Sequence, residues 1–174
     1  FAGGLEKEGI TVKPSTFLLP GLLAPRGCWT RRRPGRSEME DIRFGWKIAR
    51  GIGKLDIGQC VVVRDKSVLA VEAIDGTDET ILRGGRLGSG KAVVVKLSKP
   101  HQDLRFDMPA VGTRTIEIMQ QAGARTLALE AGKAIVFDRD QMIERADFHK
   151  IAIVAESDDR IDRTEGLAAD DEAG

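Results

Sequence analysis

The stretch "KAVVVKLSKPHQDLRFDMPAVGTRTIEIMQQAG" (91–123) decides the fold, because a strand pattern gives way to a helix pattern within it. Its first part, "KAVVVKLS" (91–98), is the short valine-rich apolar run that is typical of a buried strand. After Pro109 and Gly112 the apolar spacing becomes helical over 113–123, and Gly123 ends this helix. A strand, a loop and a helix in this order indicate an α/β fold.

The segments before this stretch continue the alternation. A helix over 38–54 is predicted by apolar residues at helical spacing, namely Met39, Ile42, Trp46, Ala49 and Ile52. Ser37 and Glu40 have the spacing of a capping box at its start. Two β-rich runs around Asp65-Lys66 predict a hairpin over 59–73, and glycines end a predicted helix over 77–88.

The segments after it alternate in the same way. We expect strands at 125–130, 134–138 and 150–155, with a turn at Ala131-Gly132 and a helix at 139–149. The hairpin adds antiparallel pairing to an otherwise parallel arrangement. The sequence therefore predicts an α/β protein with a mixed β-sheet packed with helices in a single compact domain.

The predicted domain covers residues 37–156. Residues 1–36 contain four prolines, and the chain begins at Phe1 in a segment that resembles a helix end running into a strand. We therefore expect 1–36 to be the remnant of a preceding N-terminal domain plus a linker, with "TRRRPGR" (30–36) as a solvated basic loop. Residues 157–174 are polar and acidic, and we expect a disordered tail there.

Composition excludes several classes of function. The 27 basic and 27 acidic residues give zero formal net charge, which argues against nucleic-acid binding. The chain has two histidines, so any metal site would need mostly oxygen ligands. Cys28 and Cys60 lack metal-site spacing and are expected to be reduced thiols. No apolar run is long enough for a membrane span.

A glycine-rich segment, "GRLGSGKA" (85–92), has the spacing of a phosphate-binding P-loop. Ala92 replaces the Ser or Thr that would hold Mg²⁺, and a strand follows where a helix should begin. We therefore interpret the segment as a turn between a helix and a strand.

Two other segments are each open to two interpretations. In "VEAIDGTDET" (71–80), Asp75-Gly76 could form a turn with Thr77 or Asp78 capping the next helix, or Glu72, Asp75 and Asp78 could surround a metal–phosphate site. In "QDLRFDMPAVGTRT" (102–115), Asp103, Arg105 and Asp107 share one face of an extended chain. A half-buried strand explains that alternation, whereas a ligand site also explains the break before the helix N-terminus at Thr113–Thr115.

A fourth segment, "LALEAGKAIVFD" (127–138), places Glu130 and Lys133 on either side of a tight turn between two strands. This pattern favours a hairpin with an ion pair on the surface.

Three of these segments together resemble one family. "VLAVEAIDGTDETI" (68–81), "KLSKPHQDLRFDMPAVGTRTIE" (96–117) and "AGARTLALEAGKAIVFD" (122–138) are similar to the C-terminal domain of the LpxI family, the bacterial UDP-2,3-diacylglucosamine pyrophosphatases of lipid A synthesis. The resemblance extends from about residue 20 to 155. Asp75 stands where the family usually has Glu, a change that keeps the charge.

The resemblance implies a cytoplasmic Mg²⁺-dependent hydrolase that converts UDP-2,3-diacylglucosamine to UMP and 2,3-diacylglucosamine 1-phosphate (lipid X). The substrate would lie between this domain and an N-terminal domain that is missing here, so we expect the chain alone to be inactive. A homodimer and a peripheral contact with the inner membrane are left open. The alternative is a non-catalytic module that binds a nucleotide sugar or a phospholipid.

The resemblance also suggests roles for individual residues. Asp107 is the expected central catalytic and metal-binding carboxylate, with Asp103 as its partner and Arg105 as a phosphate clamp. Glu72 and Asp78 are the next candidates for metal ligands. The expected contacts to substrate phosphates are Lys96, Lys99, Gln102, Thr77, Thr113, Thr115 and Lys133.

Overall fold

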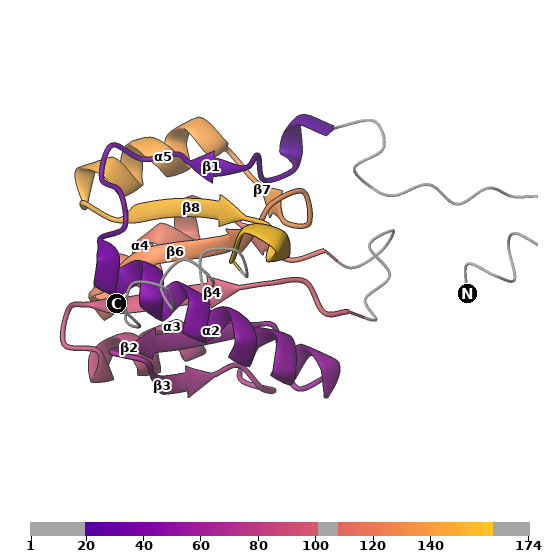
Figure 1. Cartoon of the computed structure of the whole chain (residues 1–174). Coiled ribbons are helices and arrows are strands. Elements are labelled where there is room, and N and C mark those ends of the chain that lie inside the picture. The colour runs from indigo at the N-terminus through magenta and orange to yellow at the C-terminus, as the bar shows by residue number, and fades with distance from the viewer. Residues whose placement is uncertain (1–19, 101–107, 162–174) are drawn as a thin grey trace, which may run out of the picture.

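The computed structural model describes residues 20–100 and 108–161, which form a mixed six-stranded sheet in the order β1-β8-β6-β4-β2-β3 (Figure 1). The strands are β1 (Gly27–Cys28), β2 (Cys60–Arg64), β3 (Ser67–Val71), β4 (Ala92–Lys96), β6 (Ala124–Glu130) and β8 (Ala152–Glu156). β4, β6 and β8 are parallel, whereas β1 and β2 run antiparallel to them. The predicted mixed-sheet α/β fold is thus confirmed.

Helices cover both faces of this sheet. They are α2 (Arg36–Lys54), α3 (Gly76–Leu87), α4 (Thr113–Ala122) and α5 (Arg139–Phe148), and a short 3₁₀ helix, η1, spans Pro20–Leu22. α3, α4 and α5 each connect parallel strands and step along the sheet in the same direction, so crossovers of one hand place all three on one face. α2 covers the other face (Figure 1).

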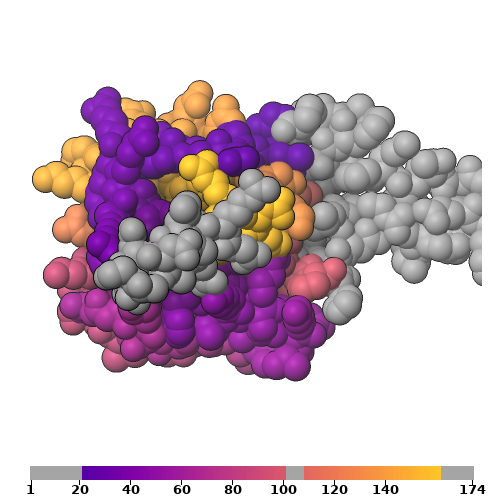
Figure 2. Space-filling model, viewed as in Figure 1, coloured from indigo at the N-terminus to yellow at the C-terminus, as the bar shows by residue number. Residues whose placement is uncertain are grey.

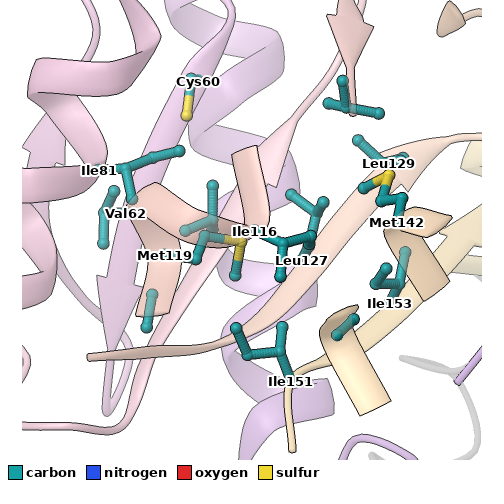
Figure 3. Packing of buried hydrophobic residues seen from close by; sticks show 14 of the residues in the cluster. Cys60, Val62, Ile81, Ile116, Met119, Leu127, Leu129, Met142, Ile151 and Ile153 are labelled. Carbon is teal, nitrogen blue, oxygen red and sulfur yellow. The ribbon is translucent and has the colours of Figure 1, made fainter. Parts of the chain in front are cut away.

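The core follows the alternation of side chains along the strands. Val62 and Val94 face α3 and α4, where they pack with Ile81 and Met119 (Figure 3). The valines next to them in sequence point to the opposite face and pack with Ile42 and Trp46 of α2; they are Val61, Val63, Val93 and Val95. Because the central strands are buried on both faces, they consist of continuous apolar runs.

Two glycines let α3 approach its neighbours closely. A Cβ atom on Gly84 would lie 2.5 Å from the Cβ of Val62, and one on Gly85 would lie 2.5 Å from the Cβ of Ala122. Contacts this short do not occur between carbon atoms, so both positions require glycine at the observed helix spacing.

The predicted hairpin is confirmed. β2 and β3 pair antiparallel across Asp65 and Lys66, whose φ angles of 50° and 55° are those of a two-residue hairpin turn. Asp41 of α2 accepts hydrogen bonds from both turn amides, at 3.0 and 2.7 Å. The glycine-rich segment 85–92 likewise forms a turn between α3 and β4, as expected.

The second predicted hairpin is wrong. The strand expected at 134–138 is reduced to β7 (Ile135–Val136), and β7 pairs in parallel with β5 (Ala110–Val111) in a separate two-stranded sheet. β6 could not accept it, because β4 and β8 already occupy both of its edges.

The domain extends beyond both predicted boundaries. Before residue 37, β1 pairs with β8, and the amide of Ala24 donates to Ala134 O at 2.9 Å. Beyond residue 156, a short helical turn places Ile161 in the core under α2, with 2% of its surface exposed. The tail predicted to begin at residue 157 therefore starts at least five positions too early, since Ile161 is still packed.

The start of α2 also differs from expectation. The helix begins at Arg36 after Gly35, and the amide of Gly35 donates to the Glu38 carboxylate at 2.8 Å. The predicted capping box of Ser37 and Glu40 is therefore wrong. Glu38 takes this role because Arg32 and Thr126 also bind its carboxylate. Among the described residues, no helix has both the length and the apolar character needed to cross a membrane.

Candidate active site

The candidate site lies where the parallel strands end. α3, α4 and α5 begin at this edge of the sheet, α2 ends there, and β5 and β7 lie beyond it (Figure 1). Ligands of open α/β sheets bind at the carboxyl ends of the strands, where helix N-termini offer free N–H groups. We call this region the carboxyl edge.

On the α3–α4 side of the sheet, Lys96 and Glu72 flank Cys60 from the two neighbouring strands. Glu72 is 8% exposed, and its carboxylate accepts the Thr77 hydroxyl at 2.9 Å and the Gln59 amide at 3.3 Å. Burial raises the pKa of the Cys60 thiol to about 12, so this cysteine is protonated at neutral pH and is not a thiolate nucleophile.

Lys96 is a buried cation with little compensation. It is 7% exposed, and its Nζ donates to Ala110 O at 3.0 Å. Within residues 20–100 and 108–161, no carboxylate forms an ion pair with it. A buried charge is costly unless it is paired. Lys96 is therefore well suited to bind an anion at the carboxyl edge.

Two predicted phosphate contacts, Thr113 and Thr115, lie in the first turn of α4, shortly after Ala110, whose carbonyl accepts Lys96 Nζ. The amide of Gly112 donates to Thr115 Oγ1 at 3.3 Å, and Arg114 pairs with Asp78 at 3.0 Å, so the first turns of α3 and α4 are linked. Thr113 Oγ1 is buried without a hydrogen-bond partner in the described part of the chain. A surface hollow at this point is lined by Asp78, residues 110–115, Phe137 and Asp138.

The capping role considered for Thr77 and Asp78 is not what the structure shows. α3 begins at Gly76 after Asp75, and neither Thr77 nor Asp78 caps it. Thr77 instead binds Glu72, and the Asp75 carboxylate accepts the Ala73 amide at 3.0 Å and pairs with Arg83. The turn at Asp75-Gly76 is present, because Gly76 has a φ of 81°.

On the α2 side, Glu130 at the end of β6 is the centre of a buried polar cluster. Glu130 is 2% exposed and accepts Arg50 Nη2 at 2.5 Å and Lys133 Nζ at 2.7 Å. It also accepts the Ser98 hydroxyl at 2.6 Å and the Ser98 amide at 3.2 Å. The Glu130–Lys133 pair expected on the surface therefore exists, but its carboxylate is buried.

Electrostatics keep this cluster charged. Burial alone would raise the pKa of Glu130, but hydrogen bonds from Arg50, Lys133 and Ser98 outweigh burial and lower its pKa to about 2. Burial would likewise lower the pKa of Arg50, and its hydrogen bonds to Glu130 and Asp158 raise it instead. Glu130 is therefore ionised at neutral pH and does not act as a proton donor.

Sequence reasoning missed Arg50, Ser98 and Asp158. The Asp158 carboxylate accepts Arg50 Nη2 at 2.8 and 2.9 Å and Trp46 Nε1 at 2.6 Å. One signal was available for Arg50, which lies one helical turn after Trp46 on the face that α2 buries. Ser98 and Asp158 had none, because only the folded sheet brings them to Glu130.

The remaining predicted residues fall into two groups. Lys99 pairs with Asp56 at 2.8 Å, and Lys133 pairs with Glu130, so both are engaged at the carboxyl edge. The predicted catalytic residues Asp103, Arg105 and Asp107, together with Gln102, lie outside the described residues. Their roles remain predictions.

The described residues do not form a metal centre by themselves. In the ranges 20–100 and 108–161, no three His, Cys, Asp or Glu side chains are grouped so that they could hold a metal ion. Glu72 binds Thr77 and Gln59, and Asp78 pairs with Arg114, so both predicted ligands have protein partners.

The fold and the carboxyl edge together define a mixed-sheet α/β domain with a buried lysine and two helix N-termini facing one ligand region. Comparison with known proteins identifies the family. Residues 25–154 match the model of the LpxI C-terminal domain. The chain is also 37% identical over 150 residues to UDP-2,3-diacylglucosamine pyrophosphatase LpxI of Caulobacter vibrioides.

The chain belongs to the LpxI family, as its three motifs indicated. The alignment with the Caulobacter protein covers 82% of this chain and 54% of that protein. The chain thus spans about half the length of this curated relative.

Proposed function

We propose that the full-length protein containing this chain hydrolyses the pyrophosphate bond of UDP-2,3-diacylglucosamine to UMP and 2,3-diacylglucosamine 1-phosphate. The observation that carries this proposal is the 37% identity to a protein named for that activity. Because the chain spans about half of that relative, we further propose that it is the C-terminal part of the enzyme and that an N-terminal domain completes the site.

The described residues supply binding groups for a diphosphate. Lys96 offers a buried positive charge, and the first turn of α4 offers backbone N–H groups beside the Thr113 hydroxyl, which has no hydrogen-bond partner among the described residues. A diphosphate carries several negative oxygens and gains further charge at the leaving phosphate during hydrolysis. Fixed donors that face that charge lower the barrier more than they strengthen substrate binding.

We also propose Mg²⁺ as the cofactor, held by Asp103 and Asp107. Carboxylate oxygens together with phosphate oxygens are the ligands that Mg²⁺ prefers, and a bound ion would neutralise phosphate charge. We propose a cytoplasmic location, with which the free thiols of Cys28 and Cys60 are compatible.

The test is release of UMP by the full-length protein, measured with Mg²⁺ and again with excess chelator. Lys96→Met and Lys96→Gln should each lower kcat/KM at least about tenfold, because a charge-assisted contact to the diphosphate is lost. Lys66→Gln is the matched control, since Lys66 lies in the β2–β3 turn at the opposite end of the sheet and its side chain is 65% exposed. Circular dichroism should show that each variant is folded.

Two outcomes would contradict the proposal. Binding of UDP-2,3-diacylglucosamine without UMP release would indicate the non-catalytic module instead. Equal UMP release by the 174-residue chain and the full-length protein would refute the shared site, because half of a cleft should lose most of the positioning contribution to catalysis.

A further inference from the structure

The chain that leaves β4 is held by every polar group of one residue. Ser98 donates its hydroxyl and its amide to Glu130, at 2.6 and 3.2 Å, and its carbonyl accepts Arg50 Nη1 at 3.0 Å. Ser98 is 6% exposed. Glu130 and Arg50 come from β6 and α2, so two separate elements fix this point of the backbone.

The position of this anchor relates it to the ligand region. Ser98 lies between Lys96 and Lys99, two of the three lysines expected to contact phosphate. Lys96 points to the α3–α4 side of the sheet, whereas Glu130 and Arg50 act from the α2 side. The cluster therefore lies on the opposite side of the sheet from Lys96, and Lys133 is its one member that is also an expected phosphate contact.

A third group holds Arg50 in place. Asp158, on the short helical turn after β8, accepts two hydrogen bonds from one Arg50 nitrogen and one from Trp46. In Figure 2 the end of the described chain, drawn in yellow, lies at the surface between the β1 segment and α2. Arg50 thus lies between the carboxylates of Glu130 and Asp158. Its planar guanidinium donates hydrogen bonds to both carboxylates and to the Ser98 carbonyl.

Stability alone does not account for such a cluster. Replacing a buried ion pair by apolar residues of similar volume is often neutral or stabilising, because burying the charges is costly. Apolar side chains could fill this space, as Ile42 and Trp46 fill the core under the earlier turns of α2. What they could not do is form three hydrogen bonds with one residue, two of them with its backbone.

We propose that Glu130 and Arg50 are positioning residues of the hydrolase. They fix the exit of β4 at Ser98 and thereby set where Lys96 and Lys99, on either side of it, meet the substrate diphosphate. Neither residue touches the substrate. This inference rests on the proposed function, and it assigns a role in turnover to two residues on the side of the sheet opposite Lys96.

The first experiment compares kcat and KM for UMP release by the full-length protein and its variants Glu130→Gln and Ser98→Ala. The control is Glu38→Gln, because Glu38 is also a largely buried carboxylate bound by an arginine and a hydroxyl, but at the other end of the sheet. All proteins are assayed at a temperature where circular dichroism shows them to be folded.

We expect Glu130→Gln to lower kcat about tenfold and Ser98→Ala to lower it about threefold, with KM changing less than about threefold in both. Glu38→Gln should change neither constant beyond about twofold while lowering the melting temperature. A kcat for Glu130→Gln that matches the Glu38→Gln value would overturn the inference.

The second experiment needs no substrate. Hydrogen exchange of the amides of Leu97, Ser98 and Lys99 should become faster in Glu130→Gln and stay unchanged in Glu38→Gln, because the Ser98 amide bonds directly to Glu130. Unchanged exchange at Ser98 would show that Glu130 does not fix the exit of β4 and would overturn the inference on its own. If the wild-type protein releases no UMP, the proposed function fails, and a positioning role in that hydrolysis fails with it.

Discussion

Removing the charge of Glu130 should destabilise the domain in a manner that depends on pH. Glutamine keeps the shape of the side chain but cannot form the charged pairs with Arg50 and Lys133. The ordinary pKa of a glutamate is 4.5, and the folded environment lowers that of Glu130 to about 2. The difference, 4.5 − 2, corresponds to about 3 kcal/mol of stability at neutral pH. Breaking a buried ion pair by removing one partner costs a similar amount.

The sign of the pH dependence follows from the direction of the shift. A carboxyl group whose pKa is lowered by folding stabilises the protein fully above pH 4.5 and loses this contribution as the pH falls toward 2. The gap in unfolding free energy between the wild type and Glu130→Gln should therefore shrink from about 3 kcal/mol at pH 7 to about 1.4 kcal/mol at pH 3.

Urea unfolding followed by tryptophan fluorescence at pH 7, 5, 4 and 3 would measure this gap. Glu117→Gln is the control, because Glu117 also pairs with an arginine, Arg145, but both side chains are about half exposed. An exposed pair of this kind contributes less than about 1 kcal/mol. A gap for Glu130→Gln that is equally small at pH 7, or that does not shrink between pH 5 and pH 3, would refute the reasoning.

Three other changes should have measurable results. Gly84→Ala should lower the unfolding free energy by at least about 1 kcal/mol because its Cβ would meet Val62, whereas Gly51→Ala, with nothing within 4 Å, should raise it by up to about 1 kcal/mol; equal effects in urea unfolding would contradict this. Ending the chain after Glu156 should lower the melting temperature by about 5 °C through loss of buried Ile161, whereas ending it after Ile161 should leave it unchanged; equal melting curves would show that the terminal turn contributes nothing. Asp107→Ala should abolish UMP release by the full-length protein without changing its melting temperature, and near-normal turnover or failure to fold would remove Asp107 from the site.

Local patterns in the sequence were sufficient for most helices and strands. Gly123, with a φ of 75°, ends α4 where predicted, and Asp65-Lys66 turns the hairpin, because both features depend only on neighbouring residues. The pairing of β7 could not be predicted in this way. It depends on which strand edges are free, and the sequence near residue 135 contains no sign that β4 and β8 enclose β6.

The same distinction applies to the site. Lys96 could be singled out as a candidate because it ends an apolar strand before a break, which is where ligands of α/β sheets bind. The Glu130 cluster could not, since its members lie at positions 50, 98, 130, 133 and 158 and only the sheet order joins them. The prediction of the start of α2 was wrong for a related reason. The Glu38 carboxylate accepts a hydrogen bond from Thr126, which is far away in the sequence.

The pairing of β1 with β8 has a consequence for the order of folding. Gly27 and Cys28 are near the beginning of the described chain, and their partners Ala155 and Val154 are near its end. During synthesis on the ribosome, the first strand of the sheet therefore waits for the last one before it can pair. Once β8 has paired with β6, its outer edge has unpaired backbone groups available to any other strand until β1 covers it. The two residues of β1 thus cover the edge at which a newly made chain could otherwise pair with a strand of another molecule.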